Sequence, residues 1–249
     1  MRQITLLAVV GIALSVVRAV AQESPSPAIS ATPTNAPEVT PSETVVPTPM
    51  ITATPTVTRS VRISFVPPPL EGMISLGVYD LAGKLVRVLH RQSPLDAFTV
   101  GADALVTKWD GKDDKGNDLP AGKYRAHGYL VGAIEVDNVV TDPVGSLPSP
   151  EGNNSVTVRL MANPLVKNDR PNVEITTGFD DKSSFLCTSD QLPLYPISPR
   201  PDVTEVVLIK NGDKSVDVWQ TCSSVGTEHF RVSKLDQMMA FDCGAFDLK

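Results

Sequence analysis

Apolar side chains recur at every second residue from Arg59 onward, and no convincing helical stretch follows. Val61, Ile63 and Phe65, for example, alternate with polar residues. Successive side chains of a β-strand point to opposite faces of its sheet, so this period predicts half-buried strands. The same pattern recurs at 74–78, 85–90, 105–109, 123–131 and 133–140. We therefore expect an all-β module over residues 60–140.

A second β-rich region follows a break in this pattern. Residues 141–154 (TDPVGSLPSPEGNN) are rich in turn formers and predict a linker. Residues 155–249 again hold short alternating segments, and the turn at Asn211–Asp213 between two apolar runs indicates a hairpin. The strand count fits either a sandwich or part of a propeller-like array, so the fold of this second domain stays open.

The first 59 residues have a different composition, which predicts export. The apolar run Ile4–Val17 is followed by small residues at Ala19–Ala21, as in a secretory signal peptide over residues 1–21, with an uncleaved anchor as the alternative. Pro, Thr and Ser make up more than half of residues 22–59, which predicts a disordered spacer. We expect a secreted, periplasmic or cell-surface protein with no integral membrane segment after cleavage.

Charge and cysteine content exclude several classes of partner and cofactor. The formal net charge of −6 argues against nucleic acid, whose phosphates require a basic face. The three cysteines, Cys187, Cys222 and Cys243, allow one bridge at most, for which we consider Cys222 with Cys243. No cysteine or histidine spacing suits zinc, so we expect no metal and no other cofactor.

The densest polar stretch is WDGKDDKGNDLPAGKY, residues 109–124, which poses a choice between a metal site and a turn. A calcium loop of the EF type needs oxygen ligands at alternate positions, glycine at the sixth and glutamate at the twelfth. Counting from Asp110 puts Lys112, Lys115 and Ala121 at the third, sixth and twelfth positions. The two lysines would also repel a cation, so the metal interpretation is the weaker one.

The turn interpretation accounts for more of these residues. Asp110–Gly111 and Lys115–Gly116 each supply a residue able to adopt positive φ. Pro120 fixes the backbone before Tyr124, which starts the next strand on an inward face. We therefore predict a connection between two strands, with Trp109 buried at the end of the first.

Two stretches, GVYDLAGKLVRVL and KWDGKDDKGNDLPAGKY, resemble the immunoglobulin-like domain of the flagellar hook-capping protein, which is found in many secreted bacterial proteins. The resemblance spans residues 60–131 and rests on Asp80, Gly83, Val86, Leu89, Trp109, Asp110, Gly111, Asp113, Gly116, Pro120, Ala121, Gly122 and Tyr124. It implies an immunoglobulin-like β-sandwich from a bacterium, in which these residues are scaffold and carry no catalytic site.

One strand row offers a candidate surface. His127 is the one histidine that we expect on an exposed strand face, in a row with Lys123, Arg125 and Tyr129. Such a row would suit an anionic glycan or another partner, although a solvated sheet face is the simpler interpretation.

Catalytic motifs are missing from the sequence. It holds no G-x-S-x-G, H-E-x-x-H, phosphate-binding glycine loop or dinucleotide fingerprint. The carboxylate pairs Asp180–Asp181 and Glu135–Asp137 are not shown by their spacing to converge across a cleft, and Trp219 and Tyr195 are the candidates for a sugar-stacking platform. We expect a non-catalytic role in adhesion, envelope assembly or scaffolding, with a protein or cell-envelope glycan partner. The alternatives are a secreted hydrolase-type enzyme, or a fragment of one, and a glycan-binding protein, with the site in residues 155–249.

Overall fold

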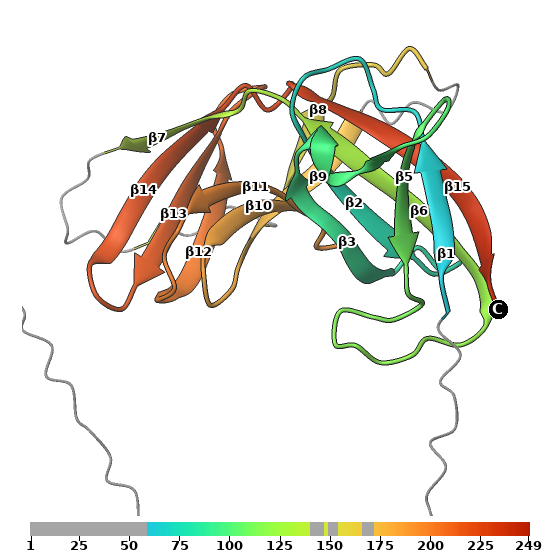
Figure 1. Cartoon of the computed structure of the whole chain (residues 1–249). Helices are drawn as coiled ribbons and strands as arrows, with labels where there is room; N and C mark the ends of the chain where they lie inside the picture. The colour runs from blue at the N-terminus through green and yellow to red at the C-terminus, as the bar shows by residue number, and fades with distance from the viewer. Residues whose placement is uncertain (1–58, 140–146, 149–153, 166–171) are drawn as a thin grey trace, which may run out of the picture. The chain divides into compact units, whose positions relative to one another are not determined.

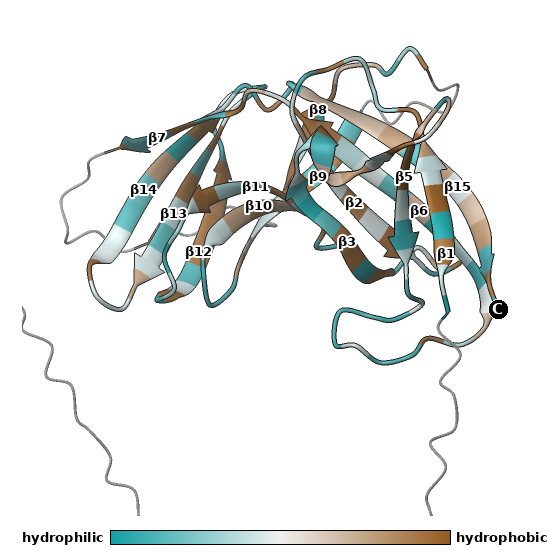
Figure 2. Ribbon diagram, in the orientation of Figure 1, coloured by the Kyte–Doolittle hydropathy of each residue, from teal (hydrophilic) through white to brown (hydrophobic). Residues whose placement is uncertain are grey.

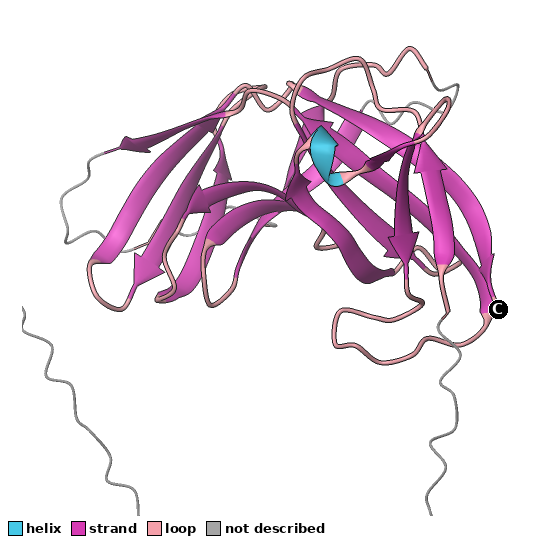
Figure 3. Cartoon of the chain, in the orientation of Figure 1, coloured by secondary structure: helices cyan, strands magenta, loops and turns pink. Residues whose placement is uncertain are grey.

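Antiparallel strands make up nearly all the regular structure of the described residues (Figure 3). The computed structural model describes residues 59–139, 147–148, 154–165 and 172–249. Within these ranges the one helical element is the 3-10 turn η1 (Leu95–Ala97), and no helix is long and apolar enough to cross a membrane. The all-β prediction is confirmed. The predicted signal peptide, nearly all of the spacer and most of the linker lie outside the described residues.

Two sheets with the strand orders β1-β5-β4 and β15-β6-β2-β3 pack around one core, and together we call them the first sandwich (Figure 1). Their strands are β1 (Val61–Phe65), β2 (Met73–Tyr79), β3 (Leu85–Ser93), β4 (Thr99–Val100), β5 (Leu105–Trp109), β6 (Gly122–Val131) and β15 (Met238–Leu248). The alternation explains how they pack, because Ile63 and Phe65 of β1 point into the core while Arg62 and Ser64 stay exposed.

The second sandwich consists of two four-stranded sheets with the orders β11-β10-β9-β8 and β12-β13-β14-β7. Its strands are β7 (Glu135–Val139), β8 (Val156–Arg159), β9 (Asn172–Phe179), β10 (Ser184–Thr188), β11 (Pro193–Ser198), β12 (Val203–Lys210), β13 (Val216–Cys222) and β14 (Gly226–Ser233). The hairpin predicted at Asn211–Asp213 joins β12 to β13, with the amide of Asn211 bonded to the carbonyl of Ser215 at 3.0 Å.

The strands are distributed between the sandwiches differently from the expected domains 60–140 and 155–249. Strand β15, near the end of the chain, pairs with β6 from Met238 opposite Val131 to Leu248 opposite Gly122. Strand β7, expected in the first module, pairs instead with β14. The second sandwich, β7 to β14, is therefore inserted between two neighbouring strands of the first. Alternation defines which face a strand buries but not which distant strand it pairs with.

Strand β6 buries side chains on both of its faces. Tyr124, Ala126 and Leu130 join the core of the first sandwich. Tyr129 and Val131 point the other way and join a larger cluster built mainly from β8 to β14. The strands in Figure 2 show the hydrophobic positions that supply these clusters. The sheet that contains β6 is therefore covered on both faces at this end of the strand.

Strand β11 has the sequence PLYPIS, whose two prolines are unusual in a strand. Proline has no amide hydrogen to donate to a neighbouring strand. A central strand pairs with a neighbour on each side, so a proline there leaves a hydrogen bond unmade. The structure places β11 at the edge of its sheet, paired only with β10, which leaves room for such residues. Apolar side chains on this strand still enter the larger cluster, through Leu194 and Ile197.

Candidate functional site

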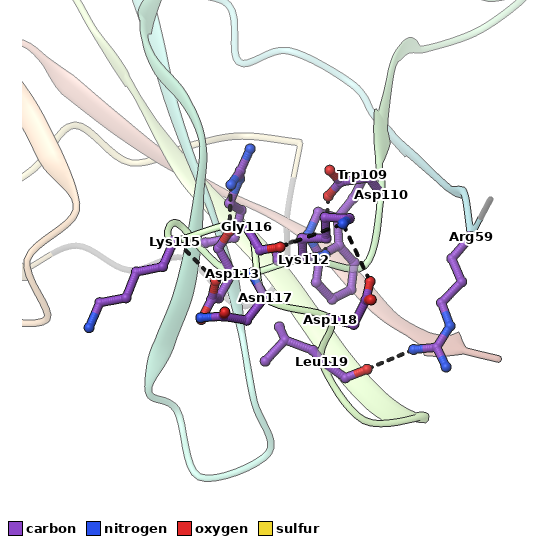
Figure 4. Close-up of polar contacts among 11 residues, drawn as sticks. Arg59, Trp109, Asp110, Lys112, Asp113, Lys115, Gly116, Asn117, Asp118 and Leu119 are labelled. Atoms are coloured by element: carbon purple, nitrogen blue, oxygen red, sulfur yellow. Dashed lines mark hydrogen bonds and ion pairs between the residues drawn. The ribbon is translucent and has the colours of Figure 1, made fainter. Parts of the chain in front are cut away.

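The stretch between β5 and β6 is the most polar loop that the sequence singles out, and it is anchored by Trp109 (Figure 4). The Trp109 side chain is 0% exposed. Its ring meets those of Tyr124 and Phe246 edge-on, at centroid distances of 5.1 and 5.9 Å, and its Nε1 donates to the carbonyl of Lys112 at 2.9 Å. The indole therefore packs in the core of the first sandwich and also holds the first turn of the loop.

Asp113 organises the centre of the loop. Its Oδ1 accepts the backbone amides of Lys115 and Asn117 at 2.9 and 2.8 Å, and its Oδ2 accepts the side-chain amide of Asn117 at 3.0 Å (Figure 4). These hydrogen bonds, those from Asn117 above all, hold the pKa of the Asp113 carboxyl below its ordinary value. Both carboxylate oxygens are thus engaged by the loop itself, as in an Asx turn.

The other aspartates of the loop face different partners. Asp110 accepts the amide of Lys112 at 3.1 Å, and Asp118 lies 3.7 Å from the Lys112 ammonium. Asp114 accepts the amide of Val88 on β3, at 2.9 Å. The carboxylates therefore do not converge, and no group of three or more His, Cys, Asp or Glu among the described residues could hold a metal ion.

Two glycines provide backbone conformations that the turns require. Gly111 has φ +76° and Gly116 has φ +81°, both in the left-handed region that side chains disfavour. At Gly111 a Cβ would also lie 2.8 Å from the side chain of Leu248, whereas nothing lies within 4 Å at Gly116. Gly111 is therefore needed for packing against β15 as well as for the turn.

The remaining motif residues also have structural roles. The Tyr124 hydroxyl donates to the carbonyl of Pro120 at 2.9 Å, and burial raises the pKa of this hydroxyl. Between β2 and β3, Asp80 accepts the backbone amide of Lys84 at 3.0 Å, and Gly83 donates its amide to the Asp80 carbonyl at 3.1 Å. The first contact holds the turn that leads into β6, and the other two close the turn between β2 and β3.

All three cysteines are free thiols in the structure. Cys222 belongs to β13 and packs in the larger cluster, whereas Cys243 belongs to β15 and packs against the core of the first sandwich. The bridge considered between them is therefore not formed. Burial raises the pKa of Cys187 to about 12 and that of Cys222 to about 11, so neither thiol is a ready nucleophile near neutral pH.

The exposed row expected on β6 is only half exposed. Lys123 and Arg125 are exposed, but His127 and Tyr129 are buried, at 8% and 5%. The His127 ring stacks on Tyr79 with a centroid distance of 3.7 Å, and Tyr129 lies in the larger cluster. The alternation within one strand could not reveal that the larger cluster packs against this face of the sheet.

The other candidate side chains lie apart from one another. Asp180 accepts from Arg91 at 2.6 Å and holds the turn between β9 and β10, and the Glu135 carboxylate pairs with an exposed lysine. Trp219 stacks on His229 at 4.0 Å, while the Tyr195 hydroxyl donates to the backbone of Ile134 at 3.2 Å. The two aromatic residues therefore belong to different sheets and form no shared platform.

A groove that the sequence did not indicate lies at one end of the second sandwich. Four basic side chains line it, and they come from three separate segments of the sequence: Arg159, the β12–β13 hairpin with Lys210 and Lys214, and Lys234. Arg159 and Lys234 lie far from this hairpin in the sequence, so only the fold brings them to its lysines.

Comparison of the chain with known protein families, with curated proteins and with solved structures finds no match. The function is therefore inferred from the contacts of these residues.

Proposed function

We propose that this chain is a non-catalytic, secreted or cell-surface protein whose β modules act in adhesion, envelope assembly or scaffolding. The observation that carries the proposal is that aspartates of the acidic loop bind backbone and side-chain amides of the protein itself. Both Asp113 carboxylate oxygens bind amides of the loop, and Asp114 binds a neighbouring strand. Side chains engaged in this way stabilise a turn, which supports a scaffold role for the loop.

The first sandwich is, in this proposal, immunoglobulin-like and of the type found in the flagellar hook-capping protein. With β1, β5 and β4 as strands B, E and D, the facing sheet β15-β6-β2-β3 has the order G-F-C-C′. The hydrogen bond from the Tyr124 hydroxyl to Pro120, at the start of β6, has the form of the tyrosine corner of such domains. Strand order and corner both support the assignment. Immunoglobulin-like domains serve many functions, so the fold alone does not select one.

Export and display follow from the N-terminal sequence. An apolar run that ends in small residues is typical of a secretory signal, and a Pro/Thr/Ser-rich segment of 38 residues would act as an extended spacer. In this proposal the spacer holds the two sandwiches away from the surface at which the chain is retained or released.

The test is expression of the full chain in a bacterial host, followed by fractionation and N-terminal sequencing. We expect an exported protein that begins at Gln22 and shows no turnover on a panel of glycosidase and protease substrates. Intact Met1 on the exported protein would contradict the proposed processing. Turnover that survives purification and is lost on a single substitution would show that the chain is an enzyme.

A further inference from the structure

The groove at the end of the second sandwich lies where the chain crosses between the two sandwiches. Two adjoining cavities of about 410 and 510 Å³ form it, and they share Lys214 and Asp236. The first is lined by the ends of β8 and β9 and by the β12–β13 hairpin, the second by the segments that join β6 to β7 and β14 to β15. We call this the crossover groove. Cavities of about 300–1,000 Å³ are typical of small-ligand sites.

The crossover groove is more basic than the chain as a whole. Its lining holds the four basic side chains named above and two acidic ones, Asp213 and Asp236, on a chain of net charge −6. Lys214 and Asp236 form an ion pair of 2.7 Å, and Lys210 lies 3.8 Å from Asp213. Lys234 is likewise paired with Glu135, so the surplus positive charge of the groove is that of Arg159, and an anion is attracted to that residue.

Arg159 is the basic residue best placed to receive a ligand. It is exposed on β8, opposite Asn172 of β9, and both residues line the groove. Among the described residues Arg159 has no ion pair and no side-chain hydrogen bond, whereas Lys210, Lys214 and Lys234 each have an acidic neighbour. A guanidinium presents two parallel donors that match a carboxylate.

The uncharged and acidic lining narrows the ligand class. Asn172, Thr157 and Ser215 supply amide and hydroxyl groups, while Asp213 and Asp236 can accept hydrogen bonds from hydroxyls but disfavour a compact anion with two charges, such as phosphate. Among the residues that the structure describes, no aromatic ring lines either cavity, so these residues offer no stacking on a neutral sugar. A ligand with one carboxylate per ring and several hydroxyls uses both parts of this lining.

We propose that the crossover groove binds an acidic oligosaccharide, with a uronate carboxylate on the Arg159 guanidinium and sugar hydroxyls on the polar lining. This inference deepens the proposed function, on which it rests, by naming the class of the glycan partner. A groove of this volume holds one or two sugar rings, so the affinity for a short oligosaccharide is expected to be modest and to fall as salt is added.

The test is calorimetric titration of the full chain with tetragalacturonate, with maltotetraose and inorganic phosphate as the neutral and compact-anion probes. We expect tetragalacturonate alone to bind. Arg159→Gln should weaken this binding roughly 10-fold or more, since hydrogen bonds between charged groups are the strong ones. Asp236→Asn should strengthen it, because the substitution removes a repelling charge and frees Lys214.

The control is Arg62→Gln, which removes an exposed arginine from β1 of the first sandwich and should leave the binding unchanged. The inference is overturned if tetragalacturonate does not bind, or if phosphate binds as tightly as tetragalacturonate. It is also overturned if the Arg159 and Arg62 variants bind tetragalacturonate equally well. Those results would leave the proposed display function standing, because export and lack of turnover are measured separately.

Discussion

Replacement of Trp109 by alanine tests whether the polar loop is scaffold. The side chain is 0% exposed and touches the rings of Tyr124 and Phe246. Truncation of a fully buried tryptophan costs about 3–5 kcal/mol through lost transfer energy and the remaining cavity. Loss of the Nε1 hydrogen bond to Lys112 adds about 1 kcal/mol, although water can reach this loop and replace part of it.

A total loss of about 4–6 kcal/mol corresponds to a fall in melting temperature of roughly 8–24 °C for a chain of this size. Phe246 belongs to β15, so the damage should extend to the strand that closes the first sandwich. Trp219→Ala is the matched control. That ring is partly exposed and stacks on His229, so its removal should cost only about 1 kcal/mol.

The assay is urea and thermal denaturation followed by circular dichroism and tryptophan fluorescence. The chain has two tryptophans, so each variant keeps one reporter, in the sandwich that was not altered. If Trp109→Ala melts within about 2 °C of the wild type, a shift below that of a 1 kcal/mol change, the anchor interpretation is wrong. The loop would then have to be reconsidered as a binding site.

Three further results are expected. Gly111→Ala should destabilise the protein by about 2–4 kcal/mol, from the positive φ and from contact with Leu248, whereas Gly116→Ala should cost about 1–2 kcal/mol from φ alone; equal losses in thermal denaturation would refute the packing role. Calcium at millimolar concentration should leave the melting temperature unchanged, and a clear rise in a calorimetric scan would restore a metal site. Cys187 and Cys222, whose thiol pKa values are about 12 and 11, should react with a thiol reagent at pH 8 only after unfolding, and fast labelling of the native chain would contradict this.

Strand positions could largely be predicted from local pattern. A strand forms where the apolar residues alternate, at Val61–Phe65. A hairpin forms at the turn residues Asn211–Asp213. The apolar ring of Trp109, directly before a turn, is fully buried. Strand β11 could not be predicted, because its prolines argue against a strand unless its edge position is known.

The sequence by itself determined the all-β class and the turn chemistry of the acidic loop, since both depend on neighbours within a few residues. Only the tertiary structure decided that β15 pairs with β6, that His127 is buried and that Arg159 and Lys234 share one groove with the lysines of the β12–β13 hairpin. The physical reason is that a strand of period two buries the same face against any compatible partner. The choice among partners depends on packing between segments that lie more than a hundred residues apart, as Gly122 and Leu248 do.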